Sequence, residues 1–349
     1  MNLDDLIISE EISVLEAMKC LNDTGCRIVF VAPQRQLQAV LTDSDVRKFI
    51  LRGGDVSAPV KEAANYSPKS LLIANRSEAR GFILKNSIEA LPLLDEEGKI
   101  ADVVFAGDLA GLSKRDKCDM PVVIMAGGLG SRLYPYTKIL PKPLIPIGEN
   151  PILEHIIHKF RDAGCQDFTL IVNYKRNMIK SYFADIEKEY DLHFVDEEIP
   201  MGTGGGLSLL EDSIQQPFFL TNCDMLIDAD YAGIARFHTE KKSEITMVCA
   251  MKHFTIPYGV VETGEDGQLV AMREKPEMNM LTNVGMYIVN PSVLALIEKD
   301  KRQDFTDIIE RCRQNGGRVG VYPISEAGWT DMGQIEELDN MRRKMEQST

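Results

Sequence analysis

From Pro121 onward, short apolar runs alternate with stretches that have the spacing of amphipathic helices. The apolar runs are 121-PVVIMA-126, 168-FTLIV-172, 217-PFFLTN-222 and 244-EITMVCA-250, and the helical stretches are 151-PILEHIIHKFRDAG-164 and 176-RNMIKSYFADIEKEY-190. This alternation is typical of βαβ units. It predicts a Rossmann-like α/β domain over residues 121–349, with a mixed, mainly parallel sheet. Ligands of such sheets bind beyond the carboxyl ends of the strands, so the segments that follow the apolar runs are the first candidates for a site.

The first 115 residues contain an internal duplication. Ile28 aligns with Leu91, and Asp45 with Asp108, at the same offset of 63 residues. Each copy has the pattern of a helix, two short apolar strands across a turn, and a helix opened by an aspartate. The duplicated segment resembles the tandem repeat named after cystathionine β-synthase, the CBS pair, whose halves pack together. We therefore assign α+β repeats to residues 1–58 and 59–115, and a linker to residues 116–120.

The CBS resemblance also implies a ligand. In that family a Thr or Ser and an Asp three residues later hold the ribose hydroxyls of an adenine nucleotide, and Thr42 and Asp45 match this pattern. The second repeat has Phe105 and Asp108 at these positions, so its hydroxyl group is missing. The resemblance implies one regulatory adenine nucleotide per chain, and the face-to-face association of CBS pairs implies a homo-oligomer. The alternative is that both aspartates are only helix N-caps.

A glycine-rich loop with several cations follows the first apolar run of the predicted sheet. It reads 125-MAGGLGSRLYPYTKILPKPLIPIG-148. A Walker loop would need Gly-Lys-Ser/Thr, but Ser131 and Arg132 follow Gly130, and a dinucleotide fingerprint would need a glycine at Leu133. Backbone N–H groups of glycines can reach phosphate oxygens that side chains would otherwise block, so the loop still suits a polyphosphate.

The order Gly-Gly-x-Gly-x-Arg-Leu, Pro-x-Thr and Pro-Lys-Pro resembles the signature of sugar-1-phosphate nucleotidylyltransferases. These enzymes join a nucleoside triphosphate to a sugar 1-phosphate and release pyrophosphate. The resemblance extends over about residues 121–345. It implies nucleotide binding by Ala126, Gly127, Gly128 and Gly130. Arg132 can fork onto the outer phosphates, and Lys142, between two prolines, would place its charge on the reacting phosphate as a catalytic group.

Two further segments match the same family. In 198-EIPMGTGGGL-207, the resemblance implies that a second glycine turn at Gly202, Thr203 and Gly204 cradles the base; the alternative is a tight strand-to-helix turn. Asp224 follows an apolar run, and Asp331 lies in a Trp-x-Asp-x-Gly turn. Two carboxylates from distant segments are a usual way to hold Mg²⁺, although either one alone is more often a helix cap. We predict Mg²⁺ on this pair, with Asp224 also catalytic.

The sugar side is assigned from 257-PYGVVE-262, 273-REKP-276 and 281-LTNVGMYI-288. The resemblance implies that Glu274 accepts hydrogen bonds from sugar hydroxyls and that Lys275 binds the sugar phosphate. Gly259 and Asn283 would line the same pocket. The alternative for Glu274 and Lys275 is a solvated surface pair.

Composition excludes several classes of partner. A net charge of −14 over 349 residues argues against nucleic acid and against an anionic membrane surface. The seven cysteines include no C-x-x-C pair, which argues against a zinc knuckle or a disulfide framework. The acidic N-terminus lacks the cations of a signal peptide, and no apolar run reaches the roughly 18 residues of a spanning helix. We expect a cytoplasmic protein.

The resemblance also suggests substrates. The Gly-Thr-Gly-Gly turn is most similar to guanylyltransferases, and a CBS pair ahead of such a domain resembles the glucosamine-1-phosphate guanylyltransferases of legionaminic acid pathways. We predict transfer from GTP to glucosamine 1-phosphate or a related hexose 1-phosphate. One open alternative is uridylyl or other nucleotidyl transfer to a different sugar phosphate. The other is a non-catalytic regulatory subunit that senses a nucleotide sugar.

Overall fold

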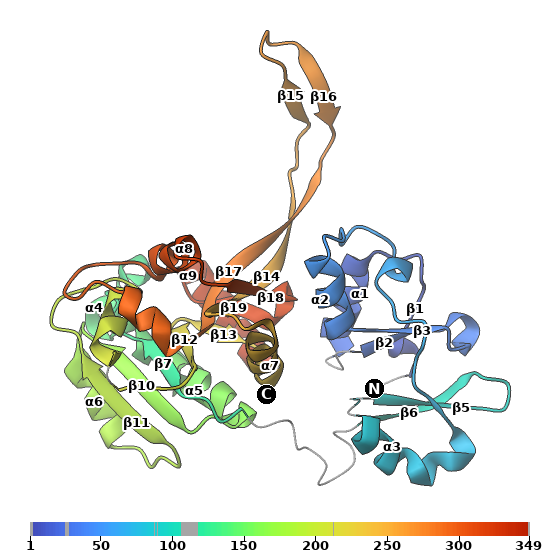
Figure 1. The fold of residues 1–349 in the computed structure, drawn as a ribbon, viewed down its shortest axis with the longest axis horizontal. Coiled ribbons are helices and arrows are strands. Elements are labelled where there is room, and N and C mark those ends of the chain that lie inside the picture. The colour runs from blue at the N-terminus through green and yellow to red at the C-terminus, as the bar shows by residue number, and fades with distance from the viewer. Residues whose placement is uncertain are drawn as a thin grey trace. The chain divides into compact units, whose positions relative to one another are not determined.

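The computed structural model describes residues 3–24, 28–86, 88, 90–105, 118–211 and 213–347. Asp108 and the first two residues of the predicted linker, 116 and 117, lie outside these ranges. The chain divides into two compact units (Figure 1). One consists of residues 1–114, 251–281 and 323–327, and the other of residues 115–250, 282–322 and 328–349.

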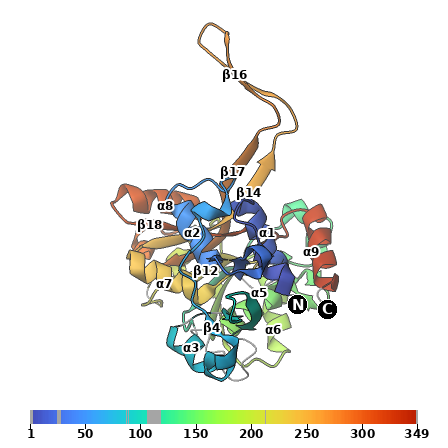
Figure 2. The ribbon, with the colours of Figure 1, turned by 90° about the vertical axis from the view of Figure 1, so that its right-hand side faces the viewer.

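Two small sheets of the same topology form most of the N-terminal part. The first contains β1 (Ile7–Ile8), β2 (Ile28–Val31) and β3 (Ala39–Thr42), and the second contains β4 (Leu71–Leu72), β5 (Ala90–Leu94) and β6 (Ile100–Phe105). In each sheet the first two strands pair parallel and the last two antiparallel. The accompanying helices, seen in Figure 2, are α1 (Val14–Thr24), α2 (Asp43–Leu51) and α3 (Ala79–Asn86). This repeated topology parallels the repeated sequence pattern, whereas the family of the repeat stays a prediction.

The two small sheets share a hydrophobic core. Leu6, Phe30, Ala90 and Ile100 are almost completely buried and belong to one cluster that draws on both sheets. The side-chain amide of Gln36 also donates to the backbone carbonyl of residue 97, at 3.2 Å. The two sheets thus bury their apolar faces in one shared core. Each sheet needs this core because a sheet of this size cannot bury enough apolar surface by itself.

Helix α2 begins with a reciprocal cap. Thr42 is the N-cap residue, and its hydroxyl accepts from the backbone N–H of Asp45 at 3.2 Å. The Asp45 carboxylate accepts from the Thr42 backbone N–H at 3.1 Å and from its hydroxyl at 2.6 Å. The alternative interpretation of Asp45 as the N-cap is therefore wrong in detail: Thr42 is the cap, and Asp45 completes a capping box from the third helical position.

The larger unit is built around a seven-stranded sheet in the order β11-β10-β7-β12-β17-β14-β18. Its strands are β7 (Val122–Met125), β10 (Asp167–Val172), β11 (Asp191–Asp196), β12 (Phe218–Asn222), β14 (Ile245–Thr255), β17 (Glu277–Val289) and β18 (Val319–Ser325). The pairs β11–β10, β10–β7 and β7–β12 are parallel, and β17 is antiparallel to β12. The predicted α/β class with a mixed, mainly parallel sheet is confirmed.

Helices cover both faces of this sheet. Neighbouring residues of a strand point to opposite faces. Accordingly Phe218 joins the cluster that contains Leu207 and Ile308, while Phe219 packs edge-on against Phe160 at 5.2 Å between ring centroids. Burial on both sides explains why β7 is an unbroken apolar run rather than an alternating one. The helices around the sheet include α4 (Tyr136–Ile139), α5 (Ile152–Ala163), α6 (Arg176–Ala184), α7 (Tyr231–Lys241), α8 (Phe305–Gln314) and α9 (Ile335–Gln347).

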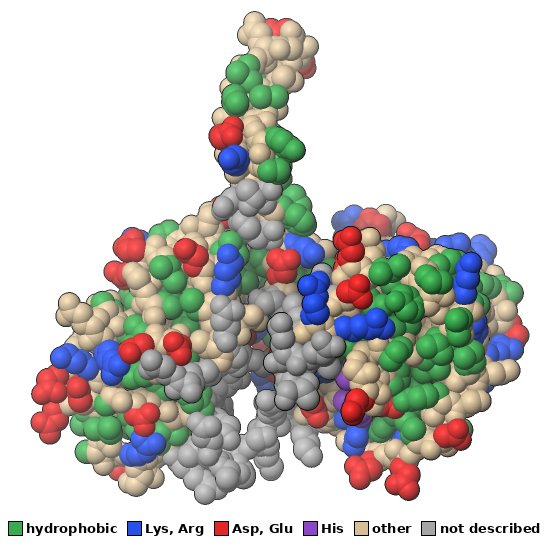
Figure 3. Space-filling model, turned by 180° about the vertical axis from the view of Figure 1, so that it is seen from behind, with side chains coloured by type: hydrophobic (Ala, Val, Ile, Leu, Met, Phe, Trp, Pro, Cys, Tyr) green, Lys and Arg blue, Asp and Glu red, His purple; other side chains and the backbone are tan. Residues whose placement is uncertain are grey.

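Strands β14 and β17 continue into a two-stranded ribbon formed by β15 (Val260–Thr263) and β16 (Leu269–Arg273), labelled in Figure 1. Large apolar side chains of the ribbon are exposed, as the hydrophobic atoms at the top of Figure 3 show. Val261, Val270 and Met272 are 55%, 68% and 62% exposed. Throughout the described ranges, every helix is too short or too polar to cross a membrane.

Candidate active site

The carboxyl ends of four parallel strands meet at one edge of the large sheet. The glycine loop follows β7, Asn173 follows β10 and Glu197 follows β11, while Asp224 is the second residue after β12. Ligands of open α/β sheets bind at this edge. Asn173 and Glu197 were missed in the sequence analysis. Asn173 could have been found as the first residue after the predicted apolar run 168–172, whereas no strand was predicted before Glu197.

The first glycine loop presents unbonded backbone donors. Among the described residues, the N–H groups of Gly128, Leu129 and Gly130 donate to no protein acceptor. A Cβ atom at Gly128 would meet no atom within 4 Å, so open space lies beside this part of the backbone. Successive free N–H groups in a turn form a concave site for anions. The loop can therefore bind phosphate oxygens through its backbone.

The other two predicted phosphate-binding glycines, Gly127 and Gly130, help to set the conformation and packing of the loop. Gly130 has a φ of 64°, which favours glycine, and its carbonyl accepts from the Thr137 hydroxyl at 2.8 Å. A Cβ at Gly127 would lie 3.0 Å from Glu197 Oε2 and 3.1 Å from Asn173 Cβ. Of the three predicted phosphate-binding glycines, only Gly128 faces open space.

Lys142 and Asp224 form an ion pair at the end of this loop. Lys142 begins a short 3₁₀ helix after Pro141, and its ammonium group donates to Asp224 Oδ2. The two side chains are only 12% and 18% exposed. Partial burial strengthens the attraction, because water screens the charges less. The structure thus brings together two residues that lie 82 positions apart in the chain.

Asp331 joins the same cluster through a small second sheet. Strands β13 (Met225–Ile227) and β19 (Trp329–Asp331) pair antiparallel, with Met225 opposite Asp331. The Met332 N–H also donates to the Asp224 carbonyl at 2.8 Å. The two predicted metal ligands are therefore held side by side by backbone pairing.

The pKa of Asp331 reflects its burial and the charged residues that surround its carboxyl group. Burial raises the pKa of this carboxyl to about 6, and the negative charges of Asp224 and Glu337 act in the same direction. The cations Lys142 and Arg132 oppose the shift, which places Arg132 near the same carboxyl. Glu337, in the first turn of α9, is a further acid that the sequence analysis missed.

The carboxylates of this cluster fit a divalent cation. Asp224 Oδ1 and Glu337 Oε2 are buried and accept no hydrogen bond from the described part of the chain. Buried charged oxygens without a partner are costly, and a hard cation would satisfy them. No three His, Cys, Asp or Glu side chains of the described residues converge tightly enough to hold an ion alone. A site of two carboxylates completed by water and phosphate is what Mg²⁺ usually takes.

The second glycine turn is bonded to its own chain. The N–H groups of Gly204 and Gly205 both donate to the Gln303 carbonyl, at 3.0 and 3.1 Å. The Thr203 hydroxyl accepts from the N–H of Phe305 at 3.1 Å. These bonds tie the turn to the start of α8, as expected of a tight strand-to-helix turn. Base binding by Gly202, Thr203 and Gly204 stays a prediction.

Glu197 lies between the two glycine segments. The residue is 4% exposed, and its Oε1 accepts from the Met201 N–H at 3.1 Å. Its Oε2 is the oxygen that lies 3.0 Å from the Cβ position of Gly127. Burial raises the pKa of this carboxyl. A buried acid with one oxygen toward the loop is a strong candidate for ligand contact.

The predicted sugar-binding residues divide between the two units. Gly259 directly precedes β15 of the ribbon, and Glu274 and Lys275 directly follow β16. A Cβ at Gly259 would be 3.0 Å from Glu274 Oε2, so these two residues are neighbours. Lys275 is exposed and has a φ of 44°. Asn283 belongs to the other unit, where its amide donates to the Tyr287 hydroxyl at 2.7 Å and accepts from the Gly285 N–H at 3.0 Å.

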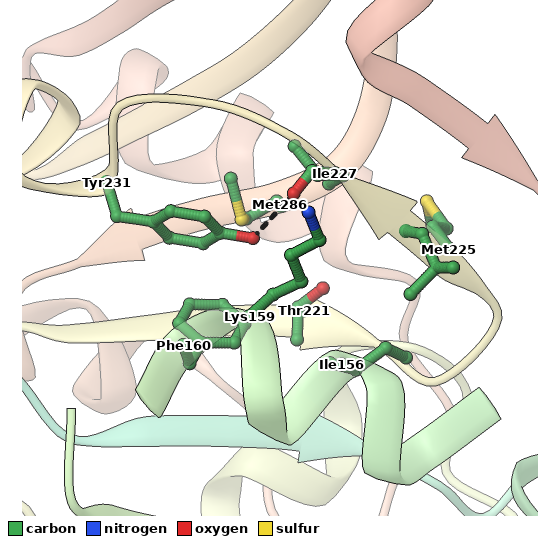
Figure 4. Close-up of a pocket in the computed structure, with 9 residues that line it drawn as sticks. Ile156, Lys159, Phe160, Thr221, Met225, Ile227, Tyr231 and Met286 are labelled. Carbon is green, nitrogen blue, oxygen red and sulfur yellow. Dashed lines mark hydrogen bonds between the residues drawn. The ribbon is translucent and has the colours of Figure 1, made fainter. Parts of the chain in front are cut away.

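A small cavity near β12 and β13 is not a ligand site. Its volume is about 10 Å³, which is room for a single water. Figure 4 shows Phe160, Thr221 and Tyr231 around it, and the Tyr231 hydroxyl donates to the Ile227 carbonyl at 2.8 Å. The cavity lies among packed side chains of α5 and the strands, so it plays no part in the candidate site.

Comparisons with known proteins identify a family for residues 121–348 of the chain. Residues 121–348 match the family described as nucleotidyl transferase. A mannose-1-phosphate guanyltransferase of Pichia angusta is 34% identical over 233 residues, covering 63% of this chain and 62% of the relative. The enzyme of the same description from Schizosaccharomyces pombe is 36% identical over 227 residues, covering 62% of each. The crystal structure of HddC from Yersinia pseudotuberculosis superposes with a TM-score of 0.52 at 25% identity, covering 65% of this chain and 99% of that one.

The match therefore spans about three fifths of the length of these curated relatives. The family match includes the glycine loop, Lys142, Asp224 and Asp331, and it covers the strands of the large sheet. Because the family match covers well over half of the chain, the chain belongs to the nucleotidyl transferase family.

Proposed function

We propose that this chain is a sugar-1-phosphate nucleotidylyltransferase, which forms a nucleotide sugar and pyrophosphate from a nucleoside triphosphate and a sugar 1-phosphate. The observation that carries the proposal is the glycine loop beside the Lys142–Asp224 pair, whose N–H groups at residues 128–130 donate to no acceptor among the described residues. Backbone donors, a fixed cation and acids for Mg²⁺ are the parts that transfer at phosphorus requires. No Ser, Cys or His nucleophile is needed.

The arrangement suggests how the reaction proceeds. The N–H groups of the loop bind the triphosphate, and Arg132 neutralises its outer phosphates. An oxygen of the sugar phosphate attacks the α-phosphorus, the bond to the β-phosphate oxygen breaks, and pyrophosphate leaves. Lys142, fixed by Asp224, stabilises the charge that develops at the α-phosphate. Mg²⁺ bound to Asp224 and Asp331 would neutralise phosphate charge and align the reacting groups.

We infer that the base is guanine. The Glu197 carboxylate is buried beside Gly127 and offers only acceptors when ionised. Guanine presents two adjacent donors, N1–H and the exocyclic amine, to such a group. Uracil presents a single N–H between two carbonyl oxygens, which a carboxylate would repel. The guanyltransferase descriptions of the relatives support the same choice.

For the acceptor we propose glucosamine 1-phosphate or a related hexose 1-phosphate. Glu274 would accept from sugar hydroxyls, and Lys275 would bind the phosphate. Lys275→Ala should then raise the KM for the sugar phosphate and leave kcat nearly unchanged, because a contact made equally in the ground and transition states affects binding alone. A fall in kcat at unchanged KM would contradict this role.

The decisive experiment is a pyrophosphate-release assay of the full chain with GTP, UTP, ATP and dTTP against glucosamine, glucose and mannose 1-phosphates. We expect turnover with GTP and dependence on Mg²⁺. Asp224→Asn keeps the side-chain volume but removes the charge, so it should abolish most turnover. Binding of GTP without turnover for every sugar phosphate would instead indicate a nucleotide-sensing subunit.

We also propose that Thr42 and Asp45 bind one adenine nucleotide per chain, within a homo-oligomer. The capping box holds both side chains at the end of β3. The hydroxyls of a ribose could replace the hydrogen bonds that Thr42 and Asp45 make to each other. Calorimetry of the full chain with AMP, ADP and ATP tests this. Asp45→Ala should abolish the heat without changing basal turnover, and absence of heat with all three nucleotides in the wild type would refute it.

A further inference from the structure

Glu337 is more buried than its neighbour Glu336, and the position of the two residues in the helix does not explain this difference. Both Glu336 and Glu337 lie in the first turn of α9, where a negative charge interacts favourably with the helix dipole. Glu336 is exposed and meets this role in water. Glu337 is partly buried, and its Oε2 is shielded from solvent without a hydrogen-bond partner. Such placement costs free energy unless a ligand compensates it.

The unpaired oxygen points to the same space as the Asp331 carboxylate. A Cβ atom at Gly333 would lie 2.8 Å from Asp331 Oδ2 and 3.2 Å from Glu337 Oε2. Both oxygens therefore lie beside Gly333, and they are no further apart than the sum of these two distances. Two acids held this close repel each other unless a cation, or a donor carried by it, interacts with both.

We propose that Glu337 is a positioning residue of the metal site, which accepts a hydrogen bond from a water bound to the ion that Asp224 and Asp331 hold. This inference rests on the proposed function. A direct bond is disfavoured because three acids do not converge on one point in the described part of the chain. Mg²⁺ keeps several of its waters, and partners of those waters typically change metal affinity 10–100-fold.

The test measures metal binding rather than turnover. Mn²⁺ is titrated into the full chain without nucleotide, and free Mn²⁺ is followed by electron paramagnetic resonance. Glu337→Gln should weaken Mn²⁺ binding by about tenfold, at the lower end of the range for such partners. Glu336→Gln is the matched control, because it removes the same charge from the same helix turn, and it should change the affinity less than twofold. Thermal unfolding of both variants checks that the fold is retained.

Each outcome decides the inference. Equal Mn²⁺ affinity in both glutamine variants and the wild type would reduce Glu337 to a helix-terminal acid. If Asp224→Asn abolishes Mn²⁺ binding while Glu337→Gln leaves it intact, the metal site stands and only the role of Glu337 falls. Absence of Mn²⁺ binding in the wild type refutes the inference as well, and the pyrophosphate assay then shows separately whether the proposed function survives.

Discussion

The two glycine segments of the large unit look alike in sequence and differ in what their backbones do. In the first, the N–H groups of Gly128, Leu129 and Gly130 donate to no acceptor in the described part of the chain, and Gly128 borders open space. In the second, the N–H groups of Gly204 and Gly205 are bonded to Gln303. A Cβ at Gly204 would lie 2.5 Å from Ile308 and 2.9 Å from the backbone nitrogen of Phe305.

This difference separates two reasons for using glycine. In the first loop, the lack of side chains leaves the backbone open to a ligand. In the second segment, the lack of side chains lets residues of the same chain, at the start of α8, pack against the backbone. A glycine-rich segment therefore predicts that some group comes close to its backbone. It does not predict whether that group belongs to a ligand or to another segment of the protein. The partner decides whether a substitution affects catalysis or stability, and the following predictions test that distinction.

The largest effect is expected at the cation of the first loop. Lys142→Ala should lower kcat by about 10²–10³-fold, the usual loss when a preorganised charge is removed from a transition state. Lys138→Ala is the control, because Lys138 is exposed on the same loop. Steady-state pyrophosphate release measures both variants. Similar losses for both lysines would mean that the loop acts through its overall charge and not through one fixed group.

Gly204→Ala should chiefly destabilise the fold. The new methyl group would press on Ile308 and on the backbone of Phe305, and overpacking of this kind typically costs about 1–3 kcal/mol. Urea denaturation of the variant and the wild type gives the difference in the free energy of unfolding. An unchanged midpoint together with weaker GTP binding would assign the second turn to the ligand and remove the contrast.

Gly128→Ala should show the reverse pattern. Its Cβ meets no protein atom, so the free energy of unfolding should change by less than about 0.5 kcal/mol, as at other open surface sites. The KM for GTP should rise about tenfold, which corresponds to about 1.4 kcal/mol of lost binding. Denaturation and kinetics on one preparation give both values. A destabilised variant with normal KM would show that the loop packs internally.

The smallest effect concerns Glu197, which lies between the two segments. Its pKa in the folded state is raised by burial, so its contribution to stability is fully present below the unfolded pKa and is lost as pH rises through the folded pKa. Glu197→Gln removes this dependence. Relative to the wild type, the variant should therefore gain stability as pH rises through the range in which the wild-type Glu197 carboxyl ionises, because the amide of glutamine does not ionise. Thermal scans across this pH range test the sign.

The same substitution also tests base choice. Glu197→Gln should lower the preference for GTP over UTP, because the amide presents one donor and one acceptor in place of two acceptors. Retained preference would show that another group recognises the base.

Much of the site could be predicted because its signals are local. The apolar run of β7 ends directly at the glycine loop, Lys142 follows Pro141, and Asp224 follows the run of β12. Glu197 follows β11, whose residues alternate in burial without forming an apolar run, so the strand was not recognised. Glu337 lies beside another glutamate, and only burial distinguishes the two. Base binding by the second glycine turn was predicted from family resemblance alone, and in the structure the N–H groups of Gly204 and Gly205 donate to the Gln303 carbonyl.

The sequence by itself determined the element order, the α/β class and the loop that can bind phosphate, because each depends on hydrophobic spacing or on residues within a few positions. Only the tertiary structure decided which backbone N–H groups are left without a protein acceptor, which carboxylates are shielded from solvent and which residues share a site. Those properties depend on contacts such as Gly204 with Gln303 and Lys142 with Asp224, between segments far apart in the chain. Burial and pairing are set by what the whole fold brings together, and no local pattern encodes them.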